Sequence, residues 1–302
     1  MALRRLDMLL SNYEIIETIR ESPRSVVRRA RRRRDGLEVV LKCPGPHLSS
    51  SEYVARFRNE HVLCSMLESP RVLEVLELIE EPNEIALVTR SYPGFESLVE
   101  RGRKQPFEVG DSLRIALSIL DGLAATHAKN IVHKDIKPGN VLVDASLRNA
   151  ILIDFGIAAV VPRDLSTLAS NTQLEGTLGF MAPEQTGRIN RRVDYRSDLY
   201  GLGATLHWML VGERPFAEVS EHGALVHAHI ARVPPLLSER SSRVPPVVAR
   251  IVAKLLSKDP DDRYRGTFGL RRDLERCLET LDDLPDEAGQ LPEFEIGSVD
   301  PA

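Results

Sequence analysis

Cysteine is scarce in this 302-residue sequence, and long apolar runs are missing. The three cysteines, Cys43, Cys64 and Cys277, lie far apart and form no CxxC pair, so the sequence predicts neither a disulfide framework nor a zinc site. There is no run of about 18 apolar residues, as a membrane span would need. The opening stretch "MALRRLDMLLSNYEII" also lacks the pattern of a signal peptide. We therefore expect a soluble, cytoplasmic protein that does not associate with membranes.

Glycine is also missing from a basic stretch near the N-terminus. Eight arginines and no glycine lie between Arg20 and Arg34, although the whole chain has a net charge of −4. A nucleic-acid patch is one interpretation of this stretch. However, no aromatic residue that could stack on a base lies among the arginines. Strand alternation would also divide them between two faces, so the sequence argues against a nucleic-acid partner.

Short apolar strands and one helix are expected in the first part of the chain. Strand patterns cover residues 13–19, 25–32 and 37–43, with Asp35-Gly36 as a hairpin turn. The stretch "SSEYVARFRNEHVLCSML" has the apolar spacing of a helix. The stretches "VLEVLELIEE" and "EIALVTRSY" predict two further strands. Together these patterns predict a small antiparallel sheet with one helix.

Helical periodicity dominates the rest of the chain. The first of these helices is expected behind a capping Asp111, and the others over residues 198–211, 220–230, 245–256 and 269–281. Two end segments stand apart. Residues 1–12 form an N-terminal extension, and residues 282–302 contain seven acidic residues, three prolines and no basic residue, which predicts a disordered tail or linker.

One stretch contains the residue types that phosphoryl transfer needs. The reaction requires a carboxylate that orients the attacking hydroxyl, a cation near the transferred phosphate, and oxygen ligands for Mg²⁺. Asp135, Lys137 and Asn140 in "IVHKDIKPGNVLVD" and Asp154 in "DFGIA" are residues of these types. Each of them alone could equally cap a turn, but the ordered set favours chemistry.

These motifs resemble those of the eukaryotic-like protein kinase family. "HKDIKPGN" is similar to the family's catalytic loop and "DFG" to its metal-binding turn, while "GTLGFMAPE" resembles the end of its activation segment. "DPDDRY" contains Arg263, whose counterpart pairs with the glutamate of the APE motif, here Glu184. The resemblance covers about residues 13–281. It implies an α+β bilobal kinase fold, with a small antiparallel β-sheet lobe over about 13–91 and a larger, mainly helical lobe over about 92–281.

The resemblance implies a serine/threonine protein kinase that uses ATP and Mg²⁺ to phosphorylate protein hydroxyls. Lys42 would hold the nucleotide phosphates, with Glu60 as its partner. Asp135 would orient and deprotonate the substrate hydroxyl, and Lys137 would neutralise charge on the γ-phosphate. Asn140 and Asp154 would hold the metal. Lys137-Pro138 together with Thr177 resembles the serine/threonine version of the catalytic loop.

Among the implied nucleotide-binding residues, those of the phosphate loop depart from the family pattern. Thr89, Arg90 and Tyr92 stand where the family has its gatekeeper and hinge, and Ile19 and Val27 flank the phosphate loop. Within that loop the family has glycines where this chain has Arg20, Ser22 and Ser25. Glycine reaches positive φ and lets backbone N–H groups approach phosphates closely.

Two interpretations of this departure stay open. The chain is an active kinase in which Arg20 or Arg24 faces the triphosphate, or it is a pseudokinase that acts as a nucleotide- or partner-binding regulatory module. The phrases "ESPRSVV" and "LVHAHIA" are moreover similar to kinase domains at the N-terminus of large bacterial signalling proteins. That similarity implies a downstream ATPase or sensor module in a larger parent protein.

Overall fold

The chain divides into two compact units. The computed structural model describes residues 11–23, 25–45, 51–81, 84–161, 177–283, 291 and 293–300. The first unit runs to Gly94 and also includes Asp154–Ile157, and the second contains Phe95–Ile153 and the chain from Ala158 onward. The sequence predicts this division after about residue 91. The short segment Asp154–Ile157, however, belongs to the small unit rather than to the large one.

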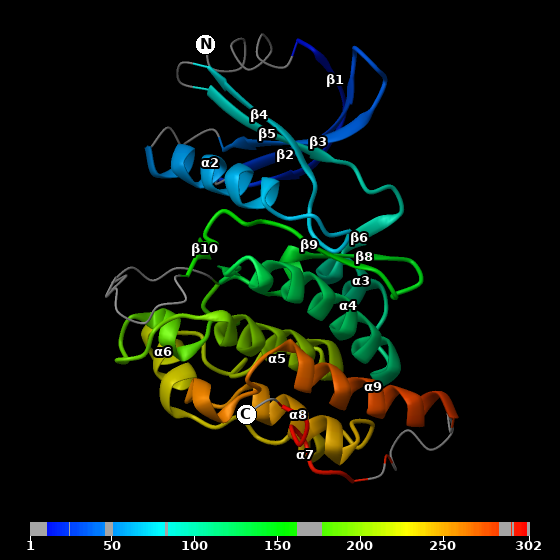
Figure 1. Ribbon diagram of the computed structural model, residues 1–302, viewed down its shortest axis with the longest axis vertical. Helices are drawn as coiled ribbons and strands as arrows, with labels where there is room; N and C mark the ends of the chain where they lie inside the picture. Colours follow the sequence, from blue (N-terminus) through cyan, green and yellow to red (C-terminus); the bar gives the residue numbers. More distant parts are fainter. Residues whose placement is uncertain are drawn as a thin grey trace. The chain divides into compact units, whose positions relative to one another are not determined.

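A five-stranded antiparallel sheet forms the first unit (Figure 1). Its order is β1-β2-β3-β5-β4, with bounds β1 Tyr13–Glu21, β2 Ser25–Arg32, β3 Glu38–Pro44, β4 Val75–Glu81 and β5 Glu84–Arg90. The expected strands are thus confirmed. The β2–β3 turn contains Gly36, whose φ of 74° suits the residue without a side chain.

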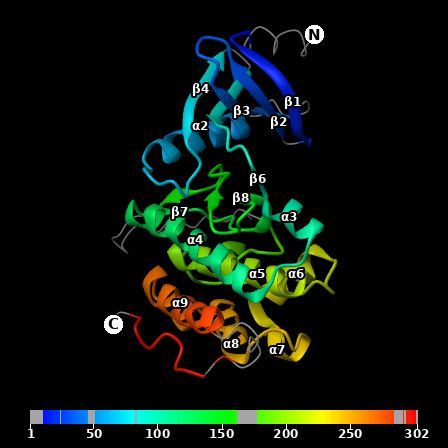
Figure 2. The same ribbon diagram turned by 90° about the vertical axis from the view of Figure 1, so that its right-hand side faces the viewer.

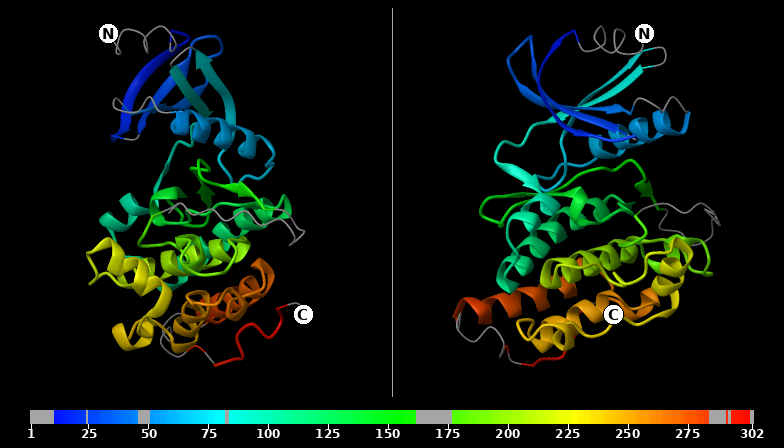
Figure 3. Two further views of the ribbon diagram at one scale, coloured as in Figure 1. Left: turned by 90° about the vertical axis from the view of Figure 1, so that its left-hand side faces the viewer. Right: turned by 180° about the vertical axis from the view of Figure 1, so that it is seen from behind.

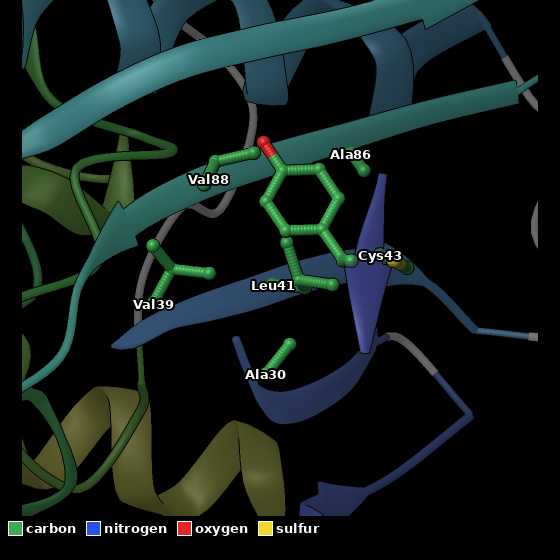
Figure 4. Packing of buried hydrophobic residues seen from close by; sticks show 7 residues of the cluster. Ala30, Val39, Leu41, Cys43, Ala86 and Val88 are labelled. Carbon is green, nitrogen blue, oxygen red and sulfur yellow. The ribbon is translucent and has the colours of Figure 1, made fainter. Parts of the chain in front are cut away.

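Period-two alternation gives this sheet two different faces. On one face the strands contribute a cluster of buried side chains, which contains Tyr13, Ala30, Val39, Leu41, Cys43, Ala86 and Val88 (Figure 4). On the other face Ile85 and Leu87 pack against Phe57 of helix α2, Ser51–Ser65. Lys42 lies beside Leu87 in the β3–β5 pairing. Its side chain therefore belongs to the face that α2 covers.

Helices make up most of the second unit (Figure 2). They are α3 Leu98–Lys104, α4 Val109–Ala128, α5 Tyr195–Val211, α6 His222–Ala231, α7 Leu237–Arg240, α8 Pro246–Leu255 and α9 Thr267–Asp283. Helix α5 is apolar on almost every side and packs between α4 and α8, as expected for a central buried helix. Gly203 lets it approach α8, because a Cβ there would lie 2.6 Å from the Cβ of Leu255.

Short strands and turns complete the second unit. β6 Phe95–Ser97, β8 Val141–Asp144 and β9 Ala150–Leu152 form a sheet in the order β6-β8-β9, and β7 Ile131–Val132 pairs with β10 Ala159–Val160. The described residues of this unit also form three 3₁₀ turns: η1 Pro138–Asn140, η2 Pro183–Thr186 and η3 Pro260–Asp262. No helix in the described part of the chain has the length and apolarity that crossing a membrane requires.

The start of α4 differs from the prediction. The helix begins at Val109 with Glu108 as its N-cap residue, and the Glu108 side chain makes no capping hydrogen bond. Asp111 is therefore not the cap. It lies in the first turn, where its carboxylate accepts a hydrogen bond from Arg114 at 3.5 Å and where negative charge complements the helix dipole.

The C-terminal segment also differs from the expected disordered tail. Described residues 293–300 run beside α8 and α9 (Figure 3). The Arg276 guanidinium lies 4.3 Å from the Phe294 ring centroid, and Arg250 donates to the Phe294 carbonyl at 3.3 Å. Composition alone favoured disorder because it took no account of these basic residues on the two helices, which bind the acidic segment.

Candidate active site

Lys42 stands at the centre of an ionic cluster in the first unit. Its Nζ lies 2.6 Å from Glu60 Oε2 and 2.8 Å from Asp154 Oδ1. The alternation of β3 directs Lys42 toward α2. Glu60 lies one helical turn after Phe57, whose ring centroid is 5.7 Å from Lys42 Nζ. The structure thus brings together three of the predicted site residues.

Burial controls the electrostatics of this cluster. The Glu60 side chain is only 1% exposed, and burial raises its pKa, an effect that the neighbouring Lys42 opposes. Burial would lower the pKa of Lys42, but the carboxylates of Asp154 and Glu60 outweigh it and hold the pKa above its ordinary value. Lys42 therefore stays charged.

Asn59 supports the turn that carries Asp154, and the sequence reasoning missed it. Its Nδ2 donates to the carbonyls of Phe155 and Gly156, at 3.4 Å each. Asp154 has a φ of 68°, a conformation that non-glycine residues adopt only where their surroundings impose it. Contacts from both α2 and Lys42 therefore hold this turn.

The predicted catalytic loop forms a second polar cluster, in the second unit. Asp135 Oδ2 accepts hydrogen bonds from Lys137 Nζ at 2.5 Å and from Asn140 Nδ2 at 2.9 Å. Its other oxygen accepts from the Thr177 N–H at 3.0 Å. Lys137 Nζ also donates to Thr177 Oγ1 at 2.5 Å. The structure therefore gathers these four residues around one carboxylate.

Buried groups on α5 fix the backbone that leads into this loop. Asp198 accepts hydrogen bonds from the N–H groups of His133 at 2.9 Å and Lys134 at 2.8 Å, and its Oδ2 also lies 2.8 Å from His127 Nε2. A Cβ on Gly201 would lie 2.9 Å from the Ile136 carbonyl, so only glycine permits this approach. His127 and His133 thus act here through packing and hydrogen bonds.

A buried ion pair ties η2 to the segment after η3. Arg263 donates to both oxygens of Glu184, at 2.6 and 2.9 Å, and both side chains have zero exposure. Ser197 donates to the same carboxylate at 2.7 Å. The predicted pairing of Arg263 with Glu184 is therefore confirmed. Such a bidentate, fully satisfied pair is the form in which buried charges are tolerated.

The glycine-free turn between β1 and β2 is closed by its own serines. Ser22 Oγ accepts from the Ser25 N–H at 3.1 Å and donates to the Ser25 carbonyl at 3.0 Å, while the Ser22 N–H donates to that carbonyl at 3.0 Å. Arg20 pairs with Val27 across the strands. Ile19 is 49% exposed, and Arg24 lies outside the described residues.

Acidic neighbours neutralise much of the arginine stretch. Arg29 pairs with Glu17 at 2.9 Å, and Arg32 pairs with Asp35 at 2.7 Å. Charges that are already paired within the sheet contribute little to a field that attracts phosphate backbones. These contacts agree with the expectation that the stretch is an outer strand rather than a nucleic-acid patch.

The predicted gatekeeper residue Thr89 and the predicted hinge residues Arg90 and Tyr92 lie at the end of β5 and just after it. Thr89 is buried, and its hydroxyl donates to the Val40 carbonyl at 3.4 Å. Arg90 forms an ion pair with Glu74, and Tyr92 accepts from the Glu74 N–H at 3.0 Å through its hydroxyl. These bonds anchor the segment to β3 and to Glu74, which directly precedes β4.

The two clusters, one in each unit, together with the antiparallel sheet and the mainly helical second unit, define a protein kinase. Residues 13–272 match the protein kinase domain family, and the chain belongs to that family.

Curated relatives agree with this assignment. The chain is 30% identical over 262 residues to the "Probable serine/threonine-protein kinase pknA2" of Bifidobacterium longum, which covers 85% of this chain and 34% of that protein. It is 30% identical over 277 residues to the "Serine/threonine-protein kinase PknB" of Mycolicibacterium smegmatis, covering 90% and 44%. With the "Serine/threonine-protein kinase pkn2" of Myxococcus xanthus it shares 34% identity over 239 residues, covering 76% and 28%. The chain thus spans less than half the length of these relatives.

Proposed function

We propose that this chain is an active protein serine/threonine kinase that transfers the γ-phosphate of ATP to hydroxyl groups of proteins. The arrangement around Asp135 carries the proposal. A carboxylate that accepts hydrogen bonds from Lys137, Asn140 and the Thr177 N–H is held in one orientation. Such a fixed carboxylate can align a hydroxyl and accept its proton during transfer.

Lys137 supplies the positive charge in this cluster. Its ammonium contacts both Asp135 and Thr177, so it lies where the hydroxyl and the transferred phosphate would meet. A cation fixed beside the reacting atoms stabilises the charge that develops in the transition state. Lys42 would hold the α and β phosphates, and Glu60 keeps the Lys42 ammonium in place through their ion pair.

The donor set suits Mg²⁺. That ion takes oxygen ligands, commonly one or two carboxylates together with substrate phosphates. Asn140 turns its Nδ2 toward Asp135, so the amide geometry directs its Oδ1 the other way. Asp154 directly follows Ile153, whose N–H donates to the Asn140 carbonyl at 3.0 Å. Asn140 and Asp154 would therefore hold the metal, which neutralises phosphate charge when bound.

The closed turn between Ser22 and Ser25 supports a role in nucleotide binding. A turn that is already fixed loses little conformational entropy on binding, which offsets part of what glycine would provide. Arg20 adds positive charge at the base of this turn and would face the phosphates. Ile19 and Val27 would contact the base, Thr89 would be the gatekeeper, and Arg90 and Tyr92 would belong to the hinge.

Two broader proposals rest on the sequence phrases and the overall composition. The similarity to kinase domains of large bacterial signalling proteins supports a downstream ATPase or sensor module. The cysteine content supports a cytoplasmic location.

The test compares wild type with Asp135→Asn, in an assay with labelled ATP, Mg²⁺ and generic protein substrates. We expect the variant to lower kcat by about 10² to 10⁴ fold, as loss of a general base commonly does. The rise in melting temperature that ATP causes should persist in it. Asp111→Asn, which removes a carboxylate in the first turn of α4, is the matched control and should stay active. Equal, negligible transfer by wild type and Asp135→Asn would instead favour the regulatory alternative.

A further inference from the structure

Gln185 lies in η2 and is buried, with 7% of its surface exposed. Its side chain makes two hydrogen bonds. Oε1 accepts from the Ala182 N–H at 3.0 Å, and Nε2 donates to the Lys134 carbonyl at 2.6 Å. A single side chain therefore connects the end of the activation segment to the peptide bond that carries Asp135.

That peptide bond belongs to an unusual stretch of backbone. Lys134 has a φ of 66°, a left-handed conformation that lysine adopts rarely and at an energetic cost. Asp198 accepts the Lys134 N–H at 2.8 Å, which fixes one side of the residue. The carbonyl on its other side is bound by Gln185.

Each of these bonds has a different consequence for the carboxylate. The bond to Asp198 fixes the peptide before Lys134, whereas the bond from Gln185 fixes the peptide between Lys134 and Asp135. Rotation of this second peptide would swing Asp135 away from Lys137 and from the Thr177 N–H. Within that peptide, the Asp135 N–H also donates to His133 Nδ1, but over the longer distance of 3.3 Å. The shorter bond from Gln185 is therefore the stronger restraint on its plane.

We propose that Gln185 is a positioning residue for phosphoryl transfer, which sets the orientation of Asp135 by holding the Lys134 carbonyl. This inference rests on the proposed kinase function. It also couples the end of the activation segment to the catalytic carboxylate, because the same amide holds the Ala182 N–H.

Gln185→Glu tests this role with minimal change in shape. An ionised carboxylate still accepts from Ala182 but cannot donate to Lys134, and it repels that carbonyl. We expect kcat to fall about tenfold or more near neutral pH, since small misplacements of a catalytic group cost up to about a hundredfold. The KM for ATP should change little, because both hydrogen bonds of the Gln185 side chain are made to residues of the second unit. Gln105→Glu adds the same charge at the exposed end of α3 and serves as the control.

A pH series separates positioning from general damage to the fold. A protonated carboxylic acid can donate to Lys134 as the amide does, and burial favours the protonated form. The ratio of wild-type to Gln185→Glu kcat should therefore shrink as the pH is lowered from about 8 to about 6, where burial shifts such titrations. The ratio for Gln105→Glu should stay constant.

Hydrogen exchange gives a second measurement that does not depend on activity. Amide protons of residues 131–137 should exchange faster in Gln185→Glu, while those of α9 should not change. An unchanged kcat, a lowered kcat without recovery at lower pH, or unchanged exchange in 131–137 would each overturn the inference. A wild-type chain that transfers no phosphate would instead refute the proposed function, and the exchange result would still decide whether Gln185 orders the loop.

Discussion

Two residues beside the chemistry have left-handed backbone, Lys134 with a φ of 66° and Asp154 with a φ of 68°. In non-glycine residues such conformations cost about 1–3 kcal/mol each. Each is held from two sides. Asp198 and Gln185 bind the peptides around Lys134. Lys42 binds the side chain of Asp154, and Asn59 binds the carbonyls of the two residues that follow it. Hydrogen bonds made elsewhere in the fold thus stabilise strain next to the reacting groups.

His229 in α6 shows how burial makes stability depend on pH. Its ring lies 5.2 Å from the Phe216 ring, centroid to centroid, and its Nδ1 lies 2.8 Å from the Tyr200 hydroxyl. Burial, and then the charges of Lys258 and Arg214, lower its pKa to about 3. The unfolded chain keeps the ordinary histidine pKa of about 6.5. It therefore binds a proton first as the pH falls.

Because the His229 pKa is lower in the folded protein than in the unfolded chain, we expect the free energy of unfolding to fall below about pH 6.5, by up to about 1.4 kcal/mol per pH unit. The His229 contribution is fully present above that pH. The slope of the unfolding free energy against pH reports how many more protons the unfolded chain binds than the folded protein. His229→Gln should lower that number by about one, as measured by urea unfolding between about pH 7.5 and 5.5. His222→Gln changes an exposed histidine in the same helix and should keep the wild-type slope. Identical slopes for the two variants would contradict the assignment.

Motif residues and supporting residues were not equally predictable. Asp135, Lys137 and Asn140 lie within six residues of one another, so their sequence order already indicated a shared loop. Asn59 and Gln185 act on partners 96 and 51 positions away in the chain. Neither periodicity nor local spacing carries information about such distant pairs.

At the scale of elements, predictions succeeded where one pattern extended over several residues. Strand β3 shows period-two alternation of burial, and helices α8 and α9 follow helical periodicity. Strands β7 and β10 have only two residues each, which is too short for a pattern. Pairing between distant segments forms them instead. The helix boundary near Asp111 was wrong because no side chain caps α4 there.

The docked C-terminal segment permits a direct measurement. Phe294 packs under Arg276, so Phe294→Ala should destabilise the fold by about 1 kcal/mol through lost cation–π and apolar contact. Phe268→Ala truncates a phenylalanine that is 58% exposed and should have a much smaller effect. Urea unfolding of both variants measures the difference. Equal stabilities would show that the segment adds nothing to the free energy of unfolding.

At the scale of the whole molecule, opposite charges are distributed so that local excesses cancel. The arginines of β2 find acidic partners in the same unit, and the acidic C-terminal segment finds arginines on α8 and α9. Composition indicated the first result through the net charge of −4. It could not indicate the second, because the sign of a segment does not say what the segment packs against.

The proposed catalytic groups are divided between the two units, and this division determines how variants should behave. Lys42, Glu60 and Asp154 are bonded to one another within the first unit. Asp135, Lys137 and Asn140 are bonded within the second. Each set therefore has its own internal support, so damage to one set should leave the other ordered.

We accordingly expect Lys42→Met to abolish the melting-temperature rise that ATP causes and to leave hydrogen exchange in residues 131–137 unchanged. It also leaves Glu60 buried without its cation, which costs up to about 3–5 kcal/mol, so adding Glu60→Gln should restore part of the stability but no activity.

Asp135→Asn should keep the ATP effect and lose transfer. Because groups that act in one reaction are not additive, Lys42→Met with Asp135→Asn should transfer phosphate no more slowly than the worse single variant. Faster exchange in 131–137 after Lys42→Met would contradict this independence of the two sets.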